Sequence, residues 1–317
     1  MTTVKERVSG LFINGYAVWI IVAVLAAVAS LTSDTFLTER NIPNVLGQTI
    51  PLIIITCGLF IAIIAGQIDL SVAALVKLTA VLVSGIGDGD MGKFLIAAAL
   101  AYSIGLAVGL VNSLFIVVFK APAFIVTLGM FSVLEGLVLA YTVKGVGSVP
   151  TSVINFFYGS VGPIPYAFIA LLVMLALLFA WFHFSRLSLR LYAVGGDKEV
   201  ARRSGVNSGP VITWAMVLCS LFAVTAGIAQ VSRAGVGAPT TGEGLELSAI
   251  TAVIIGGASL LGGRGRLIGA IGGAVLLILI DNALNMIGVS QYSQGLFRGA
   301  IIVLAIALFV AKRGSRT

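Results

Sequence analysis

One segment of this sequence has the spacing of a phosphate-binding loop. Residues 87–93 read Gly-Asp-Gly-Asp-Met-Gly-Lys, which matches the first seven positions of the GxxxxGK pattern. The match ends at Phe94, where a Ser or Thr hydroxyl should reach a magnesium ion, and no strand is expected before the segment. We therefore interpret residues 87–93 as a turn and expect no nucleotide hydrolysis by this chain.

The cysteines and the single histidine do not belong to any catalytic or metal-binding motif. Cys57 and Cys219 lie inside apolar runs and lack metal-ligand spacing, and His183 has no Ser or Cys nucleophile motif near it. The sequence offers no paired carboxylates placed for acid–base catalysis. We expect the chain not to be an enzyme and to hold no metal and no cofactor of its own.

Four charged residues interrupt apolar runs, namely Asp69, Lys77, Glu135 and Asp281. A charge in hydrocarbon is costly, so each side chain should face protein, water or a partner. Asp69 and Ser71 together are typical of a helix amino-terminal cap, although Asp69 is also a candidate ligand. Lys77 follows Asp69 by eight residues on roughly the same helical face, which allows either an ion pair or the lining of a polar passage.

Asp281, Asn282 and Asn285 form a second polar group near the end of an apolar run. On a helix the four-residue spacing places Asp281 beside Asn285. Such a group either makes hydrogen bonds between helices or lines a passage for a polar substrate.

The most polar stretch is residues 185–209, which predicts one short helix between two glycine-containing ends. Gly195 and Gly196 form a flexible turn, Asp197 caps the free N–H groups, and Gly205 closes the carboxyl end. Ala201 and Ser204 lie within the predicted helix, and Glu199 precedes Arg202 and Arg203 by three and four residues, a favourable spacing for ion pairs. A helix of about seven residues is unstable alone, so it needs an external surface. The alternative is an ordinary basic loop.

The amino-acid composition indicates that most of the chain is surrounded by lipid and not by water. The 317 residues are 59% hydrophobic and only 10% charged, and their mean hydropathy is +1.13. A soluble domain carries about 25% charged residues, so this chain has too few to cover a water-facing surface. Soluble enzymes, nucleic-acid binders and disordered proteins are thereby excluded. The apolar runs are long and continuous, which indicates helices rather than a barrel.

We expect an all-α, polytopic transmembrane bundle that forms one domain over residues 1–317, with about ten spans. The expected helices are about 16–33, 45–65, 70–87, 93–119, 122–142, 166–184, 211–231, 247–262, 267–287 and 292–311. The amino end also has features of a signal peptide, but we interpret it as an uncleaved first helix because all later runs belong in the membrane.

The basic residues predict the orientation. If both termini are cytoplasmic, the inner segments hold 13 of the 19 Lys and Arg residues, as the positive-inside rule requires. These are Lys5, Arg7, Lys120, Arg186, Arg190, Lys198, Arg202, Arg203, Arg264, Arg266, Lys312, Arg313 and Arg316. The net charge of +7 is then a topology signal, so no nucleic-acid partner is expected.

Four further features follow in order along the chain: Gly66-Gln-Ile-Asp-Leu-Ser71, Pro122-Ala-Phe-Ile-Val-Thr-Leu-Gly129, the loop from Arg186 to Gly205, and Glu246 to Gly265, followed by Asn282-Ala-Leu-Asn285. Together these stretches resemble the permease subunits of ribose- and xylose-type sugar importers of the ATP-binding cassette class. Some positions depart from the family pattern, among them Gln67, Lys77, Glu135, Ser188, Asp197 and Ser248.

The resemblance implies a division of labour in a bacterial inner membrane. Two permease copies form the passage, a separate ATPase pair uses ATP and magnesium, and a periplasmic binding protein delivers the sugar. The fold would be that of a type II importer permease, and the coupling helix between Gly195 and Gly205 would seat in the ATPase. Candidate residues of the sugar passage are Gln67, Asp69, Asn112, Asp281, Asn282 and Asn285.

The alternative is a secondary transporter that acts alone. An ion gradient would drive it, with Asp69, Glu135 or Asp281 as the titrating site. Transport by the purified chain under an ion gradient would favour this alternative, whereas a need for an ATPase and a binding protein would favour the importer.

Overall fold

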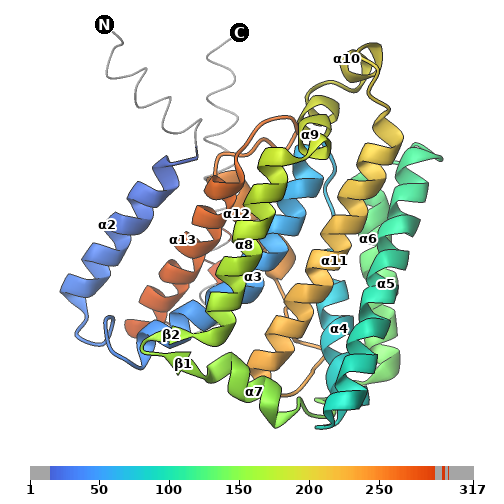
Figure 1. Ribbon diagram of the computed structural model, residues 1–317. Coiled ribbons are helices and arrows are strands. Elements are labelled where there is room, and N and C mark those ends of the chain that lie inside the picture. The colour runs from blue at the N-terminus through green and yellow to red at the C-terminus, as the bar shows by residue number, and fades with distance from the viewer. Residues whose placement is uncertain (1–14, 290–294, 297–298, 300–317) are drawn as a thin grey trace, which may run out of the picture.

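The computed structural model describes residues 15–289, 295–296 and 299 (Figure 1). The helices are α2 (Ala17–Thr32), α3 (Asn41–Ile64), α4 (Val72–Gly87), α5 (Met91–Val117), α6 (Ala123–Tyr141), α7 (Thr151–Tyr158), α8 (Tyr166–Phe184), α9 (Arg186–Gly196), α10 (Lys198–Arg203), α11 (Ser208–Ala234), α12 (Leu245–Ile255) and α13 (Leu267–Met286). A short antiparallel hairpin joins β1 (Ser160–Val161) to β2 (Ile164–Pro165).

The long helices run side by side between two ends of a bundle (Figure 1). We call the end that carries α9 and α10 the α10 end, and the end that carries α7 and β1–β2 the hairpin end. Helix α11 packs against α3, α4 and α5, while α13 packs against α2, α3 and α12. Helix α3 is the most enclosed long helix, and α6 and α8 leave most of their apolar side chains exposed.

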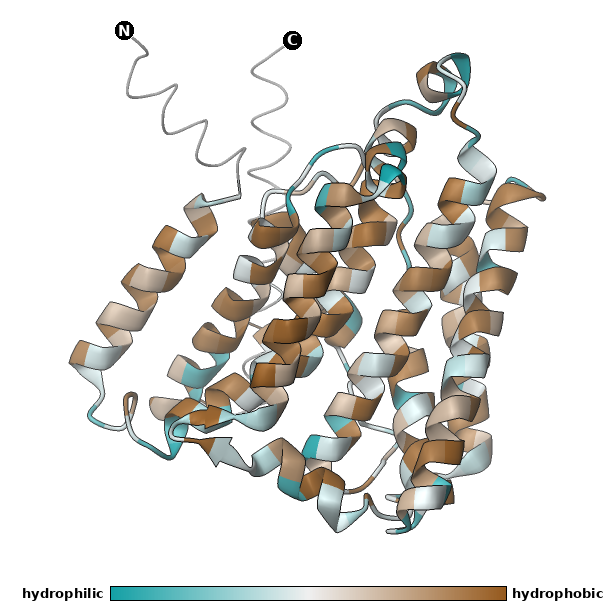
Figure 2. Cartoon of the chain, viewed as in Figure 1, coloured by the Kyte–Doolittle hydropathy of each residue, from teal (hydrophilic) through white to brown (hydrophobic). Residues whose placement is uncertain are grey.

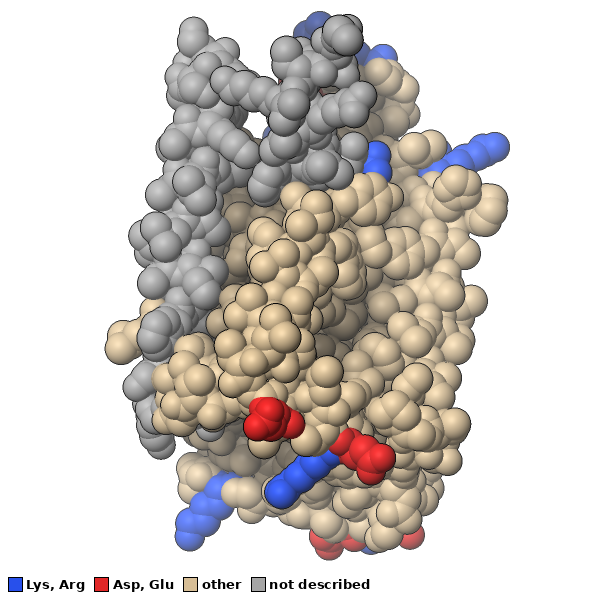
Figure 3. Space-filling model, turned by 90° about the vertical axis from the view of Figure 1, so that its left-hand side faces the viewer, with Lys and Arg blue, Asp and Glu red and all other residues tan. Residues whose placement is uncertain are grey.

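The surface is that of a protein embedded in lipid. Apolar side chains run along the outer helices, and polar residues gather at the two ends (Figure 2). On the face beside α2, a broad band free of Lys, Arg, Asp and Glu separates the charged residues of the two ends (Figure 3). The bundle therefore has the outer surface that a bilayer requires.

Six helices in the described part of the chain are long and apolar enough to cross a membrane, namely α3, α5, α6, α8, α11 and α13. Helices α2, α4 and α12 are apolar but shorter. The expected span 292–311 lies outside the described residues, apart from 295, 296 and 299. A predominantly helical bundle with membrane-spanning helices is thus observed, while ten spans remain an expectation.

Several expected boundaries differ. The expected loop from 142 to 165 contains α7 and the hairpin, and the expected helix 247–262 ends at Ile255. Gly257 follows with φ +90°, a conformation that L side chains rarely adopt, so the helix cannot continue through it. The turn expected at 87–93 is observed at residues 88–90, and Met91 to Lys93 already belong to α5. Asp90 caps α5 by accepting a hydrogen bond from the Lys93 N–H.

Helices α4 and α12 each extend along only part of the length of the bundle. Helix α3 ends at the α10 end in a Schellman motif, where Gly66 N–H donates to the Ile63 carbonyl and Gln67 N–H to the Ala62 carbonyl. Residues 67–71 then return into the bundle without helical structure, and α4 begins only at Val72. With 16 residues, α4 is about 24 Å long.

Helix α12 extends from the interior of the bundle toward the α10 end. The segment 235–244 enters from the hairpin end beside α4, where Gly237 N–H donates to Ser84 Oγ over 2.9 Å. Helix α12 begins next to Val76 and has 11 residues, or about 16 Å. Helices α4 and α12 therefore both begin inside the bundle and run toward opposite ends, an arrangement that transporters use around their substrates.

Candidate functional site

The polar stretch 185–209 folds into two short helices, α9 and α10. Asp197 begins α10, since its Oδ1 accepts hydrogen bonds from the N–H groups of Glu199 (2.8 Å) and Val200 (3.0 Å). Gly205 follows the helix with φ +79°. The expected helix, its cap and its glycine end are confirmed. The flexible turn expected at Gly195–Gly196 is wrong, because both residues belong to the last turn of α9.

Helix α10 is held together by its own charges. Glu199 pairs with Arg202 over 2.8 Å and with Arg203 over 3.2 Å, as the spacing predicted. The hydrogen bonds from Arg202 and Arg203 lower the pKa of Glu199 below its ordinary value. The described residues of α10 are exposed apart from Ala201, and the side chain of Val200 is 60% exposed. Most of the helix surface is therefore free to meet another protein.

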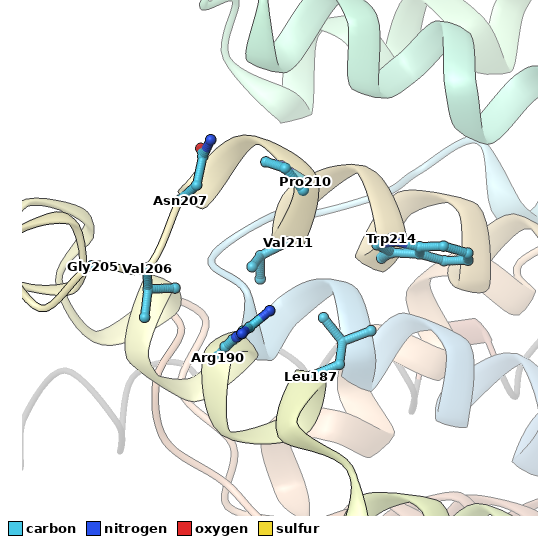
Figure 4. Close-up of a pocket in the computed structure, with 8 residues that line it drawn as sticks. All are labelled: Leu187, Arg190, Gly205, Val206, Asn207, Pro210, Val211 and Trp214. Atoms are coloured by element: carbon cyan, nitrogen blue, oxygen red, sulfur yellow. The ribbon is translucent and has the colours of Figure 1, made fainter.

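A pocket of about 340 Å³ lies at the base of α10, between α9 and α11 (Figure 4). Leu187 and Arg190 of α9 form one side, and Pro210, Val211 and Trp214 of α11 form the other. The connection from α10, Gly205 to Asn207, closes one edge. A partner that sits on α10 would find a guanidinium group and an indole ring beside it.

Helix α9 meets α3 and the α12–α13 loop through glycine backbones. Gly195 lies so close to α3 that a Cβ atom there would be 1.8 Å from the Ile64 carbonyl oxygen. The same oxygen accepts a hydrogen bond from Gly263 N–H over 3.0 Å, and Tyr192 Oη donates to the Gly265 carbonyl over 2.9 Å. We call Ile64, Gly195 and Gly263 the glycine junction. The glycine junction thus links α9 to the end of α3 and to the α12–α13 loop.

Two of the candidate passage residues meet in the interior. Asp69 Oδ1 accepts hydrogen bonds from the N–H group and the hydroxyl of Ser71, and Ser71 Oγ accepts one from Asn112 Nδ2 over 3.1 Å. Asp69 and Asn112 are fully buried, and Cys219 of α11 lies against Asp69. Asp69 thus holds Ser71, the residue just before α4, in place. The expected side-chain cap is not formed, because neither Asp69 nor Ser71 accepts a hydrogen bond from an N–H group of α4 itself. Gln67 is buried nearby and donates to the Ala65 carbonyl.

The second candidate group lies elsewhere. Asn282 and Asn41 exchange two hydrogen bonds, of 3.2 and 2.9 Å, between α13 and the start of α3. Asp281 is buried beside them, while Asn285 is exposed. The structure gives Asn282 a role in linking helices, and it does not bring this group together with Asp69 and Asn112.

Lys77 has a partner on another helix. Its Nζ lies 2.9 Å from Oε1 and 3.2 Å from Oε2 of Glu135 on α6. The Lys77 side chain is 8% exposed and that of Glu135 is 29% exposed. The ion pair foreseen for Lys77 therefore forms, but with Glu135 and not with Asp69.

Comparison with known proteins identifies the family. The family model described as "Branched-chain amino acid transport system / permease component" matches residues 41–306. The ribose import permease of Escherichia coli K12 is 35% identical over 288 residues, which cover 89% of each chain. The D-allose transport system permease of the same strain is 32% identical over 302 residues, 94% of this chain and 92% of the relative. No solved structure matches.

The chain belongs to this permease family. The permease is a multi-pass membrane protein and a transport subunit rather than an enzyme. A galactose and methyl galactoside import permease from the same strain is 30% identical over 97% of each chain, so the likeness extends along the whole permease. The expected resemblance to sugar importer permeases is confirmed.

Sequence reasoning missed two parts of the permease. It began the expected helix at residue 247, whereas α12 begins at Leu245 and holds Glu246 in its first turn. The sequence signal for this helix start was the pair Gly242 and Gly244, because glycines mark breaks between helices. In the structure both have positive φ angles and precede α12. It also missed the glycine junction, since only the fold reveals which glycines of distant segments touch.

Proposed function

We propose that this permease forms the passage of an ATP-driven importer for a pentose or a related sugar. The observation that carries the proposal is the likeness to ribose, allose and galactose import permeases over nearly the whole chain. The family description names branched-chain amino acids, so leucine is the appropriate competing substrate in a test.

The proposed assembly contains proteins that this chain lacks. A separate ATPase pair, using ATP and magnesium, sits at the α10 end, and a periplasmic sugar-binding protein docks at the hairpin end. Two copies of the permease form the passage as a homodimer. The α10 end and both termini then face the cytoplasm of a cell whose inner membrane holds the complex, and residues 1–317 form one transmembrane domain.

Helix α10 is proposed as the coupling helix, with residues 195–205 as the segment that the ATPase moves. Its support is geometric: α10 projects from the bundle, exposes nearly all its side chains, and stands on α9, which contacts α3 through the glycine junction. The surface that a short helix needs for stability would come from the ATPase.

Reconstitution tests the proposal. The permease in proteoliposomes with its ATPase and binding protein should accumulate one of ribose, allose or galactose only when ATP is present, and should not accumulate leucine. Uphill transport by the permease alone under a proton or sodium gradient would contradict it and would favour the secondary transporter.

Charge reversal tests the coupling role within the same assay. Arg202→Glu with Arg203→Glu breaks both pairs with Glu199, so sugar moved per ATP hydrolysed should fall sharply while the protein stays in the membrane. Lys144→Glu, an exposed reversal toward the hairpin end, is the control. Undiminished uptake by the double variant would show that α10 does not couple.

A further inference from the structure

The two partial helices bring charged side chains together inside the bundle. Lys77 lies in the second turn of α4, Glu246 lies in the first turn of α12, and Glu135 lies on α6. Gly242, just before α12, packs against Val76, where an added Cβ would come within 2.7 Å of a methyl carbon. The chain thus places the start of α12 beside Lys77.

The group has one cation and more than one carboxylate. Both Lys77 and Glu135 act electrostatically on Glu246, and so does Glu243. Lys77 is already bound by both oxygens of Glu135, and α4, α6 and α12 contain no other Lys or Arg. Glu246 Oε2 is inaccessible to solvent and has no hydrogen-bond partner in the described part of the chain.

An aromatic ring completes the group. Phe131 lies one turn before Glu135 on α6, and the Lys77 Nζ is 5.9 Å from its ring centre. Helices α4, α6 and α12 therefore bring together hydrogen-bond acceptors, a hydrogen-bond donor and an aromatic ring. Binding sites for small ligands typically combine a few precisely placed polar groups with apolar surface.

Lipid is a poor environment for this group. Glu135 remains 29% exposed and Glu243 is exposed, although both lie near the inner starts of α4 and α12. A charged side chain within a bilayer faces the bundle interior or a water-filled cavity, because hydrocarbon contact is costly. The face formed by α4, α6 and α12 should therefore border water.

We propose that Lys77, Glu135, Glu246 and Phe131 form a binding station for a neutral, polyhydroxylated substrate within the transport passage. This inference rests on the proposed function and names the residues that would act on its substrate. Hydroxyl groups donate to the carboxylates of Glu135 and Glu246 and accept from Lys77, and the carbon face of a sugar ring packs on Phe131.

The charge of the station discriminates between substrate classes. The carboxylates outnumber the single cation, so a substrate that carries its own carboxylate is repelled. A neutral sugar meets no such repulsion. The station therefore favours neutral sugars over acidic ones.

Glu246→Gln is the decisive variant, because it removes one charge, keeps the side-chain shape and leaves the ion pair intact. The assay uses the complete complex in proteoliposomes and whichever of ribose, allose or galactose the wild type accumulates best. Sugar moved per ATP hydrolysed should fall about tenfold, the loss expected when a hydrogen bond to a charged group is weakened. Glu39→Gln, an exposed change outside the station, is the matched control and should behave as wild type.

A charge exchange separates binding from folding. The variant with Lys77→Glu and Glu135→Lys keeps an ion pair between α4 and α6, so its melting temperature should stay near that of the wild type while uptake falls. Wild-type uptake by Glu246→Gln, or full uptake by the exchanged pair, would overturn the station while the importer itself still works. A wild-type complex that moves no sugar with ATP would instead overturn the proposed function and the station with it.

Discussion

Ser71 connects two buried polar side chains from different parts of the fold. Its hydroxyl donates to Asp69 and accepts from Asn112 on α5, and its own N–H also bonds to Asp69. The free oxygens of Asp69 and Asn112, Oδ2 and Oδ1, have no hydrogen-bond partner in the described part of the chain. The few bonds that do form must therefore carry much of the stability at the start of α4.

Ser71→Ala tests this connection. The change leaves the Asn112 amide without its partner in a buried position, which costs about 1–3 kcal/mol. We expect a lower melting temperature of the purified permease in detergent. Ser103→Ala is the control, because Ser103 is exposed on α5 and its hydroxyl bonds only to its own helix at Ala99. Equal melting temperatures of the two variants would contradict the argument.

Residue types predicted which side chains need shielding from lipid, but not which partners shield them. Lys77 had Asp69 at a suitable spacing within its own segment, yet it binds Glu135, 58 residues later in the chain. Asn282 likewise bonds to Asn41, 241 residues earlier. Such pairs depend on how distant helices pack, and spacing along one helix carries no information about them.

At the scale of elements, α9 is fixed by how closely its end approaches α3. Gly195 and Gly196 are consecutive glycines in the same turn, but their surroundings differ. A Cβ atom on Gly195 would collide with the Ile64 carbonyl, whereas a Cβ atom on Gly196 would meet nothing within 4 Å. The pair is a natural comparison between a required glycine and a replaceable one.

Gly195→Ala should uncouple the importer, and Gly196→Ala should not. A carbon–oxygen contact needs about 3.3 Å, so the added methyl group must push α9 away from α3. A misplacement of about 1 Å can cost as much as a hundredfold in rate, and we expect at least a tenfold loss of uptake per ATP hydrolysed. Comparable uptake by the two variants would show that the junction does not transmit motion.

Most elements could be predicted because long apolar runs leave few alternatives to a helix. Helices α3, α5, α6, α8, α11 and α13 lie where such runs occur. Helix α4 also lies close to its expected range of 70–87. The exception is α12, expected over 247–262, because apolar composition continues past the end of the helix at Ile255. Residues 67–71 are supported by Thr127 of α6, whose hydroxyl donates to Ile68 and accepts from Leu70, and this support is invisible in the local sequence.

At the scale of the whole molecule, the excess of basic residues expected at one end gives a test of orientation. Lys198 on α10 and Lys144 after α6 are both exposed. A cysteine at position 198 should react with a membrane-impermeant reagent only from the cytoplasmic side, and one at position 144 only from the outside. The native thiols Cys57 and Cys219 are buried and give little background. The reverse labelling would contradict the proposed orientation.

The shortness of α12 has a consequence for how the protein is made. Eleven residues cover about 16 Å, roughly half of the 30 Å of hydrocarbon, so this helix cannot be inserted alone as the ribosome releases it. The stretch before it is held by Ser84, at the far end of a helix synthesised about 150 residues earlier. Biosynthesis therefore cannot proceed as a series of independent helix entries. Helix α12 can enter the membrane only after α4, which holds the segment before it, has been inserted.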